Sequence, residues 1–301
     1  MNRTDVRNIL IIINPVAGKG RTIEIMPKIK EKLDPLKNEI EYKLILSNYA
    51  GEISEITKRH YDLGYREFIA VGGDGTLSEL INGLDFAKLE SVKIGIIPLG
   101  TGNDFVKNFS EKNDVNLVLD AVIHDQTKTV DMGIVNSHMF INVCSFGIDG
   151  PIIKDTEKYK KIFPGKFSYL FSTLKAGITF KPKKVKVQID DQIYKGQMIL
   201  VAVGNGKYFG GGMKVCPDAL LTDGLFDICL VKDVSKAKFM KEISKVYSGR
   251  LGEVNEVTYS KGRFIRIEVE DGQYLINVDG NLVGTTPVEI SIIENAVRVF
   301  V

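Results

Sequence analysis

Residues 68–76 read Phe-Ile-Ala-Val-Gly-Gly-Asp-Gly-Thr, and this stretch decides the fold of the chain. It predicts an apolar strand, Phe68–Val71, that ends in a glycine-rich turn and leads into a helix over 77–84. Glycines allow a sharp turn whose N–H groups approach an anion, and the start of the helix adds a partial positive charge. Thr76 and Glu79 have the spacing of a capping box, which places the helix start. The stretch therefore indicates a phosphate-binding turn, although an ordinary turn between a strand and a helix has the same composition.

Two further segments are organised in the same way. The apolar run Ile9–Ile13 leads into Asn14-Pro15-Val16-Ala17-Gly18, and the run Val92–Ile97 leads into Pro98-Leu99-Gly100-Thr101-Gly102-Asn103-Asp104-Phe105. In an open parallel sheet the carboxyl ends of the strands lie along one edge, and ligands bind where the crossovers change direction. The three loops are therefore expected to converge on one crevice.

Over residues 8–123, strand-like apolar runs alternate with helical periodicity. This alternation predicts right-handed βαβ units and a parallel sheet with helices on both faces. Pro27 lies inside the first predicted helix, 23–33, and is expected to kink it or to mark its true start. Further helices are predicted over 52–61, over 115–123 and near 103–109.

After about residue 129 the pattern changes to strands joined by tight turns. Strand-like segments flank Asn136-Ser137, Asp190-Asp191 and Asp271-Gly272, and the Asp-Gly pair is the strongest hairpin signal of the three. The second half is therefore predicted to be mainly antiparallel, with helices near 168–177 and 235–248. We expect an α/β domain over 1–128, completed by 288–301, and a β-rich domain over 129–287.

Composition indicates a globular protein of about two domains and excludes several functional classes. The 301 residues include 40 lysines and arginines and 38 aspartates and glutamates, and the net charge of +2 is too balanced for a nucleic-acid-binding protein. No apolar run approaches the roughly 20 residues that span a bilayer, and the amino terminus lacks a signal-peptide core. We expect a cytoplasmic chain in which Cys144, Cys216 and Cys229 are buried free thiols.

Taken together, the three loops resemble the diacylglycerol kinase catalytic-domain superfamily, which also includes the sphingosine kinases. The resemblance rests on Asn14-Pro-x-x-Gly18, Gly72-Gly-Asp-Gly-Thr76 and Pro98-Leu-Gly-Thr-Gly-Asn-Asp-Phe105, and continues through 204–213, 217–225 and 278–280. The chain is most similar to the bacterial soluble lipid kinases of the diacylglycerol kinase B and YegS type. The resemblance implies an α/β domain like that of NAD kinase and phosphofructokinase, followed by a β-sandwich that binds the lipid. It also implies transfer of the ATP γ-phosphoryl group to a lipid hydroxyl, with diacylglycerol or a related lipid as the acceptor.

The resemblance further implies which residues bind each ligand. ATP would contact residues of the three loops and one hydroxyl after the second strand: Asn14, Pro15, Val16, Ala17, Gly18, Ser47, Gly72, Gly73, Asp74, Gly75, Thr76, Leu77, Ser78 and Thr101. Asp74 would serve magnesium–ATP or approach the acceptor hydroxyl, and Asn103 and Asp104 would face the substrate. From sequence alone, these three side chains are equally explained as helix caps and helix-start carboxylates.

A structural Mg²⁺ site is implied as well. Its ligands would be the Asp223 carboxylate and the carbonyl oxygens of Leu220 and Leu225, because magnesium prefers oxygen ligands and retains several waters. From sequence alone, Asp223-Gly224 is an ordinary turn that leads into a strand.

One position departs from the family. The family commonly has Asp-Gly-Glu near its end, with the glutamate as proton acceptor, whereas this chain has Asp279-Gly280-Asn281. An amide cannot accept that proton. Either Asp279 or Asp74 supplies the base, or a dissociative transition state makes it dispensable, or the chain is a catalytically silent lipid- or nucleotide-binding protein. We expect retained activity, with Asp279 as the catalytic carboxylate, because the nucleotide loops are complete. A kinase of a small soluble acceptor such as NAD is the alternative enzyme.

Lysines and aromatic residues interleave over 154–171, at Lys154, Lys158, Lys160, Lys161, Lys166, Tyr159, Phe163, Phe167, Tyr169 and Phe171. Such a segment suits an anionic membrane surface, although from sequence alone a solvated helix and loop whose aromatic residues belong to the core is the favoured interpretation. A lipid acceptor must leave the bilayer, so we expect reversible peripheral binding at the inner face of the membrane. The oligomeric state is left open, with a homodimer as one option.

Overall fold

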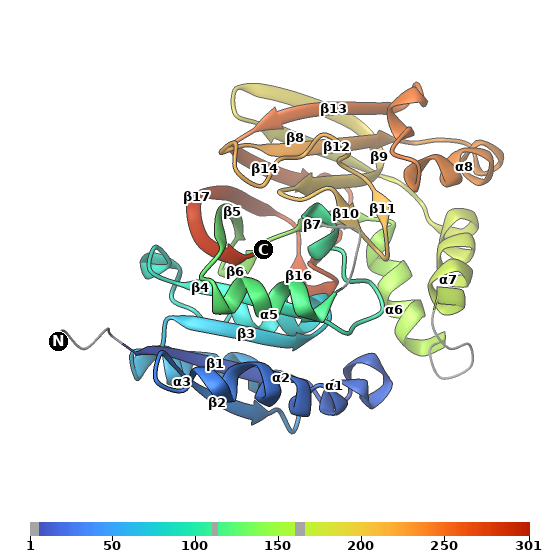
Figure 1. Ribbon diagram of the computed structural model, residues 1–301. Coiled ribbons are helices and arrows are strands. Elements are labelled where there is room, and N and C mark those ends of the chain that lie inside the picture. The colour runs from blue at the N-terminus through green and yellow to red at the C-terminus, as the bar shows by residue number, and fades with distance from the viewer. Residues whose placement is uncertain (1–5, 110–113, 160–165) are drawn as a thin grey trace. The chain divides into compact units, whose positions relative to one another are not determined.

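The amino-terminal half of the chain folds as its alternation of strands and helices predicts (Figure 1). The computed structural model describes residues 6–109, 114–159 and 166–301. The chain divides into one unit of Met1–Val130 with Asn295–Val301 and a second unit of Asp131–Glu294. The sequence predicted domain boundaries after residue 128 and after residue 287. The later division falls at Glu294 because the last strand runs without a break from the second unit into the first.

A parallel sheet with the strand order β2, β1, β3, β4, β17 forms the centre of the first unit. Its strands are β1 (Arg7–Ile13), β2 (Ile40–Leu46), β3 (Glu67–Gly72), β4 (Lys93–Pro98) and the end of β17 (Val288–Phe300). β1 lies between β2 and β3, so the crossover connections change direction at this strand. The loops after β1 and β3 therefore flank the position at which open α/β sheets bind ligands.

Helices cover both faces of this sheet. They are α1 (Arg21–Glu24), α2 (Met26–Leu33), α3 (Glu52–Asp62), α4 (Asp74–Ile81) and α5 (Val115–Ile123), with the 3-10 segments η1 (Ala17–Gly20), η2 (Asp34–Leu36), η3 (Phe86–Lys88) and η4 (Val106–Asn108). α2 and α5 pack against Ile9, Ile11 and Ile13. Leu10 and Ile12 point to the opposite face and are equally buried. Burial on both faces explains why this strand is apolar at every position from Ile9 onward.

Three local predictions in this unit can be compared with the structure. Pro27 lies in the first turn of α2, so it marks the true start of a helix. The capping-box prediction was wrong: α4 begins at Asp74 with Gly73 as N-cap, and Glu79 instead accepts the N–H of Gly51 at 3.0 Å. The helix predicted near 103–109 is reduced to η4, because Asn103 adopts a left-handed φ of 50° that a helix excludes.

The second unit is antiparallel, as its tight turns predict. Its strands are the later part of β5 (Thr127–Val135), then β6 (His138–Phe140), β7 (Val143–Gly147), β8 (Lys183–Ile189), β9 (Gln192–Gly204), β10 (Tyr208–Phe209), β11 (Met213–Lys214), β12 (Phe226–Lys232), β13 (Val257–Gly262), β14 (Phe264–Val269), β15 (Leu275–Val278), β16 (Asn281–Thr285) and the start of β17. Its helices are α6 (Asp149–Tyr159), α7 (Lys166–Thr179) and α8 (Lys236–Glu242), with η5 (Ile243–Val246) and η6 (Leu251–Glu253). The long strand β9 connects the sheet, since it pairs with β8 in its first half and with β7 and β12 in its second half. The core between the strands includes the stacked rings of Phe140 and Phe226, whose centroids lie 5.5 Å apart.

The hairpin predictions had different outcomes. Asn136-Ser137 and Asp190-Asp191 each join two strands that pair with one another. The Asp271-Gly272 prediction was wrong, because β14 pairs with β8 and β17 whereas β15 pairs with β7 and β16. Asp271 accepts the N–H of Lys184 at 3.0 Å through Oδ1. This bond attaches the turn to β8. After the turn, β15 pairs with β7 and β16 and not with β14.

Two further observations bear on the chain as a whole. Cys144, Cys216 and Cys229 are buried, as predicted. Across the described ranges, no helix has both the length and the apolar character that crossing a membrane requires.

Candidate active site

Two glycine-rich loops of the first unit pack backbone against backbone. The carbonyl oxygen of Gly72 accepts the N–H groups of Leu99 and Gly100 at 2.8 and 3.0 Å. A Cβ atom on Gly100 would lie 2.4 Å from the Cα of Gly73. Side chains at these positions would force the loops apart, so the glycines are required by the close approach of the two backbones.

The loop after β1 joins the other two. Asn14 donates from Nδ2 to the Oγ1 of Thr76 at 3.1 Å. Gly18 has a φ of 58°, and a Cβ there would lie 2.3 Å from the carbonyl oxygen of Leu99. The structure thus brings the three loops together at the carboxyl ends of β1, β3 and β4, as the sequence predicts.

The remaining residues expected to contact ATP differ in exposure. Ser47 is buried beside the end of β1, where its N–H donates to the carbonyl oxygen of Ile13 at 3.0 Å. Leu77 is only 1% exposed, so its side chain belongs to the core and only its backbone can reach a ligand. Val16, Gly75 and Thr101 are exposed, Pro15, Ala17 and Gly73 are partly buried, and Gly72, Thr76 and Ser78 are buried.

The carboxylates of Asp74 and Asp104 both approach Gly102. A Cβ on Gly102 would lie 2.8 Å from Oδ2 of Asp74 and 3.6 Å from Oδ2 of Asp104. Oδ1 of Asp74 accepts the N–H of Phe105 at 3.1 Å, and Oδ1 of Asp104 accepts from Nζ of Lys107 at 2.7 Å. Sequence analysis missed Lys107, although its i,i+3 spacing from Asp104 is a signal for such a pair.

Electrostatics distinguish Asp74 within this group. Burial raises the pKa of Asp74, the negative charge of Asp104 raises it further, and the N–H of Phe105 and the charge of Lys107 only partly oppose these effects. A carboxylate whose pKa is raised is a stronger base than an ordinary carboxylate. Asp74 is therefore suited to accept the proton of a hydroxyl group.

The side chain of Asn103 is directed into its own loop. Its Nδ2 donates to the carbonyl oxygens of Gly100 and Pro98 at 3.1 and 3.4 Å, and the residue is 3% exposed. The left-handed conformation and these bonds fix the loop that carries Thr101 and Gly102. The geometry thus supports a positioning role for Asn103, which was expected either to face the substrate or to cap a helix.

The carboxylate of Asp279, in the second unit, is held by three backbone groups. Oδ1 accepts the N–H groups of Asn142 and Val143 at 3.1 and 2.8 Å, and Oδ2 accepts the N–H of Ile141 at 2.9 Å. Asp279 also has a left-handed φ of 46°, which aspartate tolerates in turns. These bonds argue against the expected role of Asp279 as catalytic base, because proton transfer to the carboxylate would disrupt them. Asn281 lies exposed at the start of β16.

The loop expected to bind magnesium, residues 220–225, contains the Asp223 carboxylate, and Lys261 lies next to that carboxylate. Asp223 accepts the N–H of Leu225 at 3.2 Å through Oδ1, and its Oδ2 lies 3.3 Å from Nζ of Lys261. Lys261 also contacts Asp227 at 2.8 Å. Within the described parts of the chain, no group of three or more His, Cys, Asp or Glu side chains is placed to hold a metal. A magnesium ion here would therefore depend on Asp223, the carbonyls of Leu220 and Leu225, and water, a ligand set that fits Mg²⁺ chemically.

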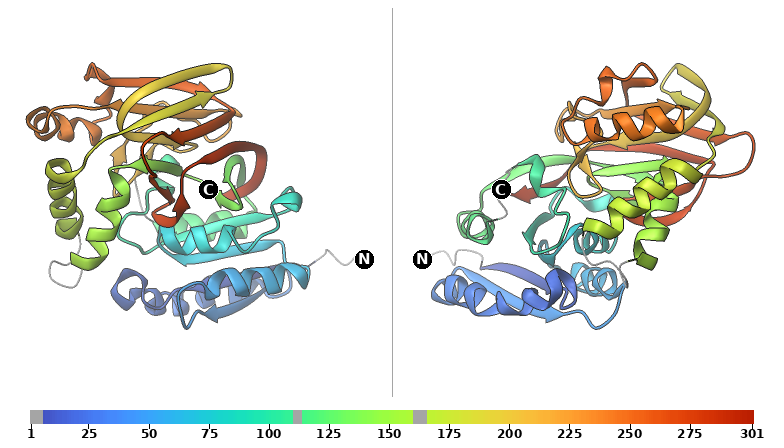
Figure 2. Two further views of the ribbon diagram at one scale, coloured as in Figure 1. Left: turned by 180° about the vertical axis from the view of Figure 1, so that it is seen from behind. Right: turned by 90° about the vertical axis from the view of Figure 1, so that its right-hand side faces the viewer.

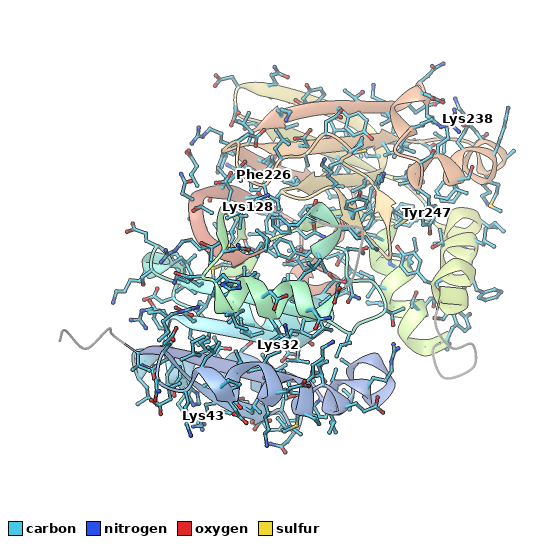
Figure 3. The ribbon with its side chains drawn as sticks, viewed as in Figure 1. Lys32, Lys43, Lys128, Phe226, Lys238 and Tyr247 are labelled. Carbon is cyan, nitrogen blue, oxygen red and sulfur yellow. The ribbon has the colours of Figure 1, made fainter. Side chains whose placement is uncertain are left out.

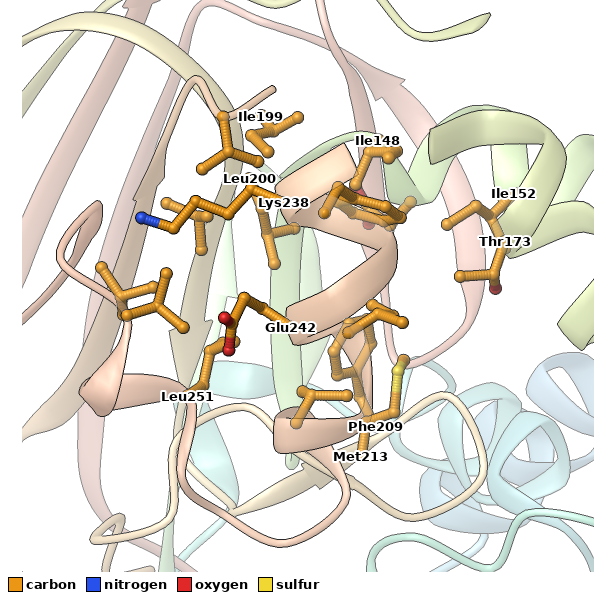
Figure 4. A pocket seen from close by; sticks show the side chains of 18 of the residues that line it. Ile148, Ile152, Thr173, Ile199, Leu200, Phe209, Met213, Lys238, Glu242 and Leu251 are labelled. Atoms are coloured by element: carbon orange, nitrogen blue, oxygen red, sulfur yellow. The ribbon is translucent and has the colours of Figure 1, made fainter. Parts of the chain in front are cut away.

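An apolar cavity of about 770 Å³, including the part open to solvent, lies in the second unit (Figure 4). Its walls come from β9 and β12 on one side and from α6, α7, α8 and η5 on the other. Ile148, Ile152, Ile199 and Leu200 are among the residues that line it, and the charged ends of Lys238 and Glu242 are also present. Its apolar lining is typical of small-molecule sites. Sequence analysis missed this cavity because its walls are far apart along the chain.

A buried polar cluster borders the cavity. Asp149 is 2% exposed, and its Oδ2 accepts from Oγ of Ser145 at 2.5 Å and from Nδ2 of Asn277 at 3.0 Å. Burial raises the pKa of Asp149. The cluster places a buried carboxyl group at the mostly apolar wall of the cavity.

Comparisons with known proteins agree over the whole chain. Residues 8–135 match the family model described as the diacylglycerol kinase catalytic domain, and residues 142–301 match the YegS C-terminal NAD kinase beta sandwich-like domain. A diacylglycerol kinase of Staphylococcus carnosus is 29% identical over 290 residues, covering 96% of this chain and 94% of that protein. One of Staphylococcus aureus (strain bovine RF122 / ET3-1) is 30% identical, with 96% and 91% covered. The crystal structure of a diacylglycerol kinase from Bacillus anthracis has a TM-score of 0.80 and 28% identity, with 99% and 98% covered.

Proposed function

The chain belongs to the diacylglycerol kinase catalytic-domain superfamily, in the branch of the diacylglycerol kinase B and YegS type, and on this basis we propose that it transfers the γ-phosphoryl group of ATP to a lipid hydroxyl. Diacylglycerol or a related lipid would be the acceptor. The observation that carries the proposal is Asp74, a carboxylate of raised pKa at the start of α4, which approaches Gly102 and accepts the N–H of Phe105 from the loop after β4. This arrangement combines a site for phosphate groups with a proton acceptor.

Each part of the first unit has a role in the proposed reaction. The backbone N–H groups of the three loops would bind the ATP phosphates, since helix starts and glycine turns favour anions. Asp74 would accept the proton of the lipid hydroxyl while the hydroxyl oxygen forms a bond to the γ-phosphorus. The bond between that phosphorus and the bridging oxygen breaks, and ADP leaves. Lys107 would position Asp104 through their ion pair, while its positive charge partly offsets the effect of Asp104 on the pKa of Asp74.

Magnesium would have two separate functions. Bound with ATP, it would neutralise charge that develops on the phosphoryl group. At the loop of Leu220, Asp223 and Leu225 it would be structural. That loop is held to the rest of the second unit by Asp131, which accepts the N–H of Gly224 at 2.8 Å.

The apolar cavity supports a lipid acceptor. A soluble acceptor such as NAD carries phosphates and hydroxyls that require polar partners, whereas the cavity of the second unit is lined chiefly by aliphatic and aromatic side chains. The transfer of hydrocarbon from water to such a surface lowers the free energy of the system and favours binding. This difference favours the lipid kinase over the NAD-kinase-like alternative. The assay described next distinguishes an active kinase from a catalytically silent binding protein.

The acceptor can be tested directly. Purified protein is incubated with labelled ATP and magnesium, and with dioctanoylglycerol, NAD or no acceptor. Label in the lipid fraction supports the proposal, label in NAD favours the alternative kinase, and nucleotide binding without any transfer indicates a silent protein.

Gly18→Ala tests whether the close packing of the loops supports ATP binding. The added Cβ would collide with the Leu99 carbonyl oxygen, and φ is left-handed, so we expect ATP affinity to fall about tenfold or more. Gly20→Ala is the matched control, because its φ of 85° is also left-handed but nothing lies within 4 Å of the new Cβ. Equal affinities of the two variants, measured by calorimetry, would contradict the packing argument.

Asp223→Asn tests the structural magnesium ion. If the ion binds the folded loop, magnesium should raise the melting temperature of the wild type, and the variant should lose most of this increase. Lys261→Gln separates the ion from the local ion pair, since it removes the contact with Asp223 but leaves the proposed ligands intact. Identical magnesium titrations for wild type and Asp223→Asn would identify an ordinary turn.

A further inference from the structure

The apolar cavity of the second unit is bordered by a buried carboxyl group, that of Asp149. This residue is 2% exposed and is among those that line the cavity. Its Oδ2 accepts hydrogen bonds from Ser145 and Asn277, whereas its Oδ1 is buried and has no hydrogen-bond partner within the described residues. Native proteins leave few buried polar atoms unpartnered, because such an atom has lost its bonds to water. Oδ1 of Asp149 is therefore suited to contact a molecule bound in the cavity.

Three elements of the fold hold this carboxyl group in place. Asp149 is the first residue of α6, Ser145 lies on β7 and Asn277 lies on β15. Nδ2 of Asn277 also donates to Oγ of Ser145 at 2.9 Å, so the three side chains all bond to one another. The start of α6 packs closely on β15, since a Cβ on Gly150 would lie 2.9 Å from the Cβ of Leu275. The direction of the carboxyl group is thus set by the fold.

α6 is itself fastened to α7, which lies beside it (Figure 2). Lys175 of α7 is paired with Asp155 of α6 at 2.8 Å. Tyr159 packs edge-on against Phe171, with ring centroids 5.1 Å apart. The wall of the cavity that carries Asp149 is therefore a packed pair of helices. The segment 154–171, whose contact with a membrane stays a prediction, also has members outside the described residues: Lys160, Lys161 and Phe163.

Other polar side chains of the cavity lining are bonded within the protein. Thr173 is on the cavity wall (Figure 4), and its Oγ1 donates to the carbonyl oxygen of Tyr169 at 2.9 Å. Glu242 is paired with Lys245 at 2.9 Å. Asp149 differs from these groups, because its Oδ1 lacks such a partner in the part of the chain that the structure describes.

The surroundings of Asp149 favour its neutral form. Among the described residues that line the cavity, Lys238 is the single cation; it lies on α8 (Figure 3) and is paired with Glu256 at 2.6 Å. Burial raises the pKa of Asp149, and the bonds from Ser145 and Asn277 oppose this effect only in part. A carboxylate without a cation at an apolar wall is costly, so the carboxyl group keeps its proton more readily than an exposed one. Since Oδ2 already accepts two hydrogen bonds, the proton belongs on Oδ1, which then acts as a donor.

From this geometry we propose that Asp149 donates a hydrogen bond from Oδ1 to an ester carbonyl of an acylglycerol bound in the cavity, and so selects acyl esters among apolar molecules. The inference rests on the lipid kinase function and names the chemical class of its acceptor. The hydroxyl group of such a lipid is the site of phosphoryl transfer, which leaves the ester carbonyls as the polar atoms that accompany the acyl chains into the cavity. A carbonyl oxygen accepts hydrogen bonds and cannot donate them, so it matches a protonated Oδ1.

The test compares dioctanoylglycerol with 1,2-dioctylglycerol ether, which keeps the hydroxyl group and lacks both ester carbonyls. Calorimetry without ATP, with each lipid below its aggregation limit, measures the two affinities. We expect the wild type to bind the ester about fivefold to tenfold more tightly than the ether, because the ether leaves Oδ1 of Asp149 unpartnered. Equal affinities of the wild type for the two lipids would overturn the proposal.

Two variants of Asp149 identify the donor. Asp149→Asn should keep the preference for the ester, since its amide oxygen can accept from Ser145 and Asn277 while its Nδ2 donates to the carbonyl. Asp149→Leu should lose the preference, because leucine has no donor. Loss of the preference in Asp149→Asn would indicate an ionised carboxylate that accepts a hydrogen bond, and would contradict the assigned role.

Thr173→Val is the matched control, because it removes a hydroxyl group of the cavity lining that is already bonded within α7. Its ratio of ester to ether affinity should equal that of the wild type. A loss of preference in this control as large as that in Asp149→Leu would show a general change of the cavity and overturn the assignment to Asp149.

The outcomes separate this inference from the function on which it rests. A protein that prefers the ester in binding but phosphorylates no lipid would refute the kinase function and retain the contact with Asp149. A protein that phosphorylates ester and ether with equal kcat/KM, and binds them equally, would retain the kinase function and refute the contact.

Discussion

Replacing Asp74 by asparagine should lower the rate of phosphoryl transfer by roughly 10²–10⁴-fold, the usual contribution of a positioned general base. Asparagine keeps an oxygen that can accept the N–H of Phe105, so the loop should remain in place. ATP affinity should change far less than the rate, because the loop N–H groups are retained. The control is Asp85→Asn, an exposed carboxylate of the same unit that accepts the N–H of Ala87 at 3.0 Å. Wild-type turnover in Asp74→Asn would remove Asp74 from the mechanism.

The raised pKa of Asp74 adds a pH dependence to this prediction. The base is active when ionised, so the rate of the wild type should fall as pH decreases through the raised pKa of Asp74. This decrease should be absent from any residual activity of Asp74→Asn. Because the pKa is raised on folding, the ionised carboxylate costs stability above its folded pKa and costs none below its unfolded pKa. Asp74→Asn should therefore be at least as stable as the wild type at neutral pH.

Replacing Asp279 by alanine should destabilise the second unit by about 3 kcal/mol or more. The change leaves the N–H groups of Ile141, Asn142 and Val143 without the carboxylate, and hydrogen bonds to a charged group contribute about 1.5–3 kcal/mol each. Denaturant unfolding measures the loss, and amide hydrogen exchange at residues 141–143 should increase. Asp271→Ala is the control, because that turn carboxylate accepts a backbone N–H from Lys184 alone among its described bonds and should cost about 1 kcal/mol.

Asp279→Asn decides between a structural and a catalytic role for this residue. The amide keeps Oδ1, which can bind Asn142 and Val143, and replaces Oδ2, so a smaller loss of stability than in Asp279→Ala is expected. Activity measured well below the melting temperature should be largely retained. Loss of activity with unchanged stability would instead support Asp279 as the base, as the sequence first suggested.

The sequence predicted the parallel sheet and the meeting of its loops because both follow from local signals. Apolar runs that end in glycines at residues 14–18, 72–76 and 98–105 locate strand ends, and parallel strands place those ends along one edge. Pro27 similarly marks a helix start by its own geometry. Such features are predictable because their cause lies within a few residues.

Features that depend on distant partners were not predicted. Glu79 has the spacing of a capping box but bonds to Gly51, and Asp271-Gly272 makes a turn whose flanking strands pair elsewhere. Asp279 lies more than one hundred residues from the N–H groups that its carboxylate binds. The cavity is assembled from elements between Ile148 and Val257. In each case tertiary contacts, and not the local pattern, determine what the residue does.

One measurement tests the central claim most directly. Purified protein is incubated with γ-labelled ATP, magnesium and a fractionated lipid extract, and the lipid products and ADP are quantified by mass spectrometry beside the Asp74→Asn variant. We predict a lipid that gains one labelled phosphoryl group in equal amount to the ADP formed, and strongly reduced product with the variant. ADP formed without a phosphorylated lipid, or label recovered only in a water-soluble acceptor, would contradict the assignment of this protein as a lipid kinase.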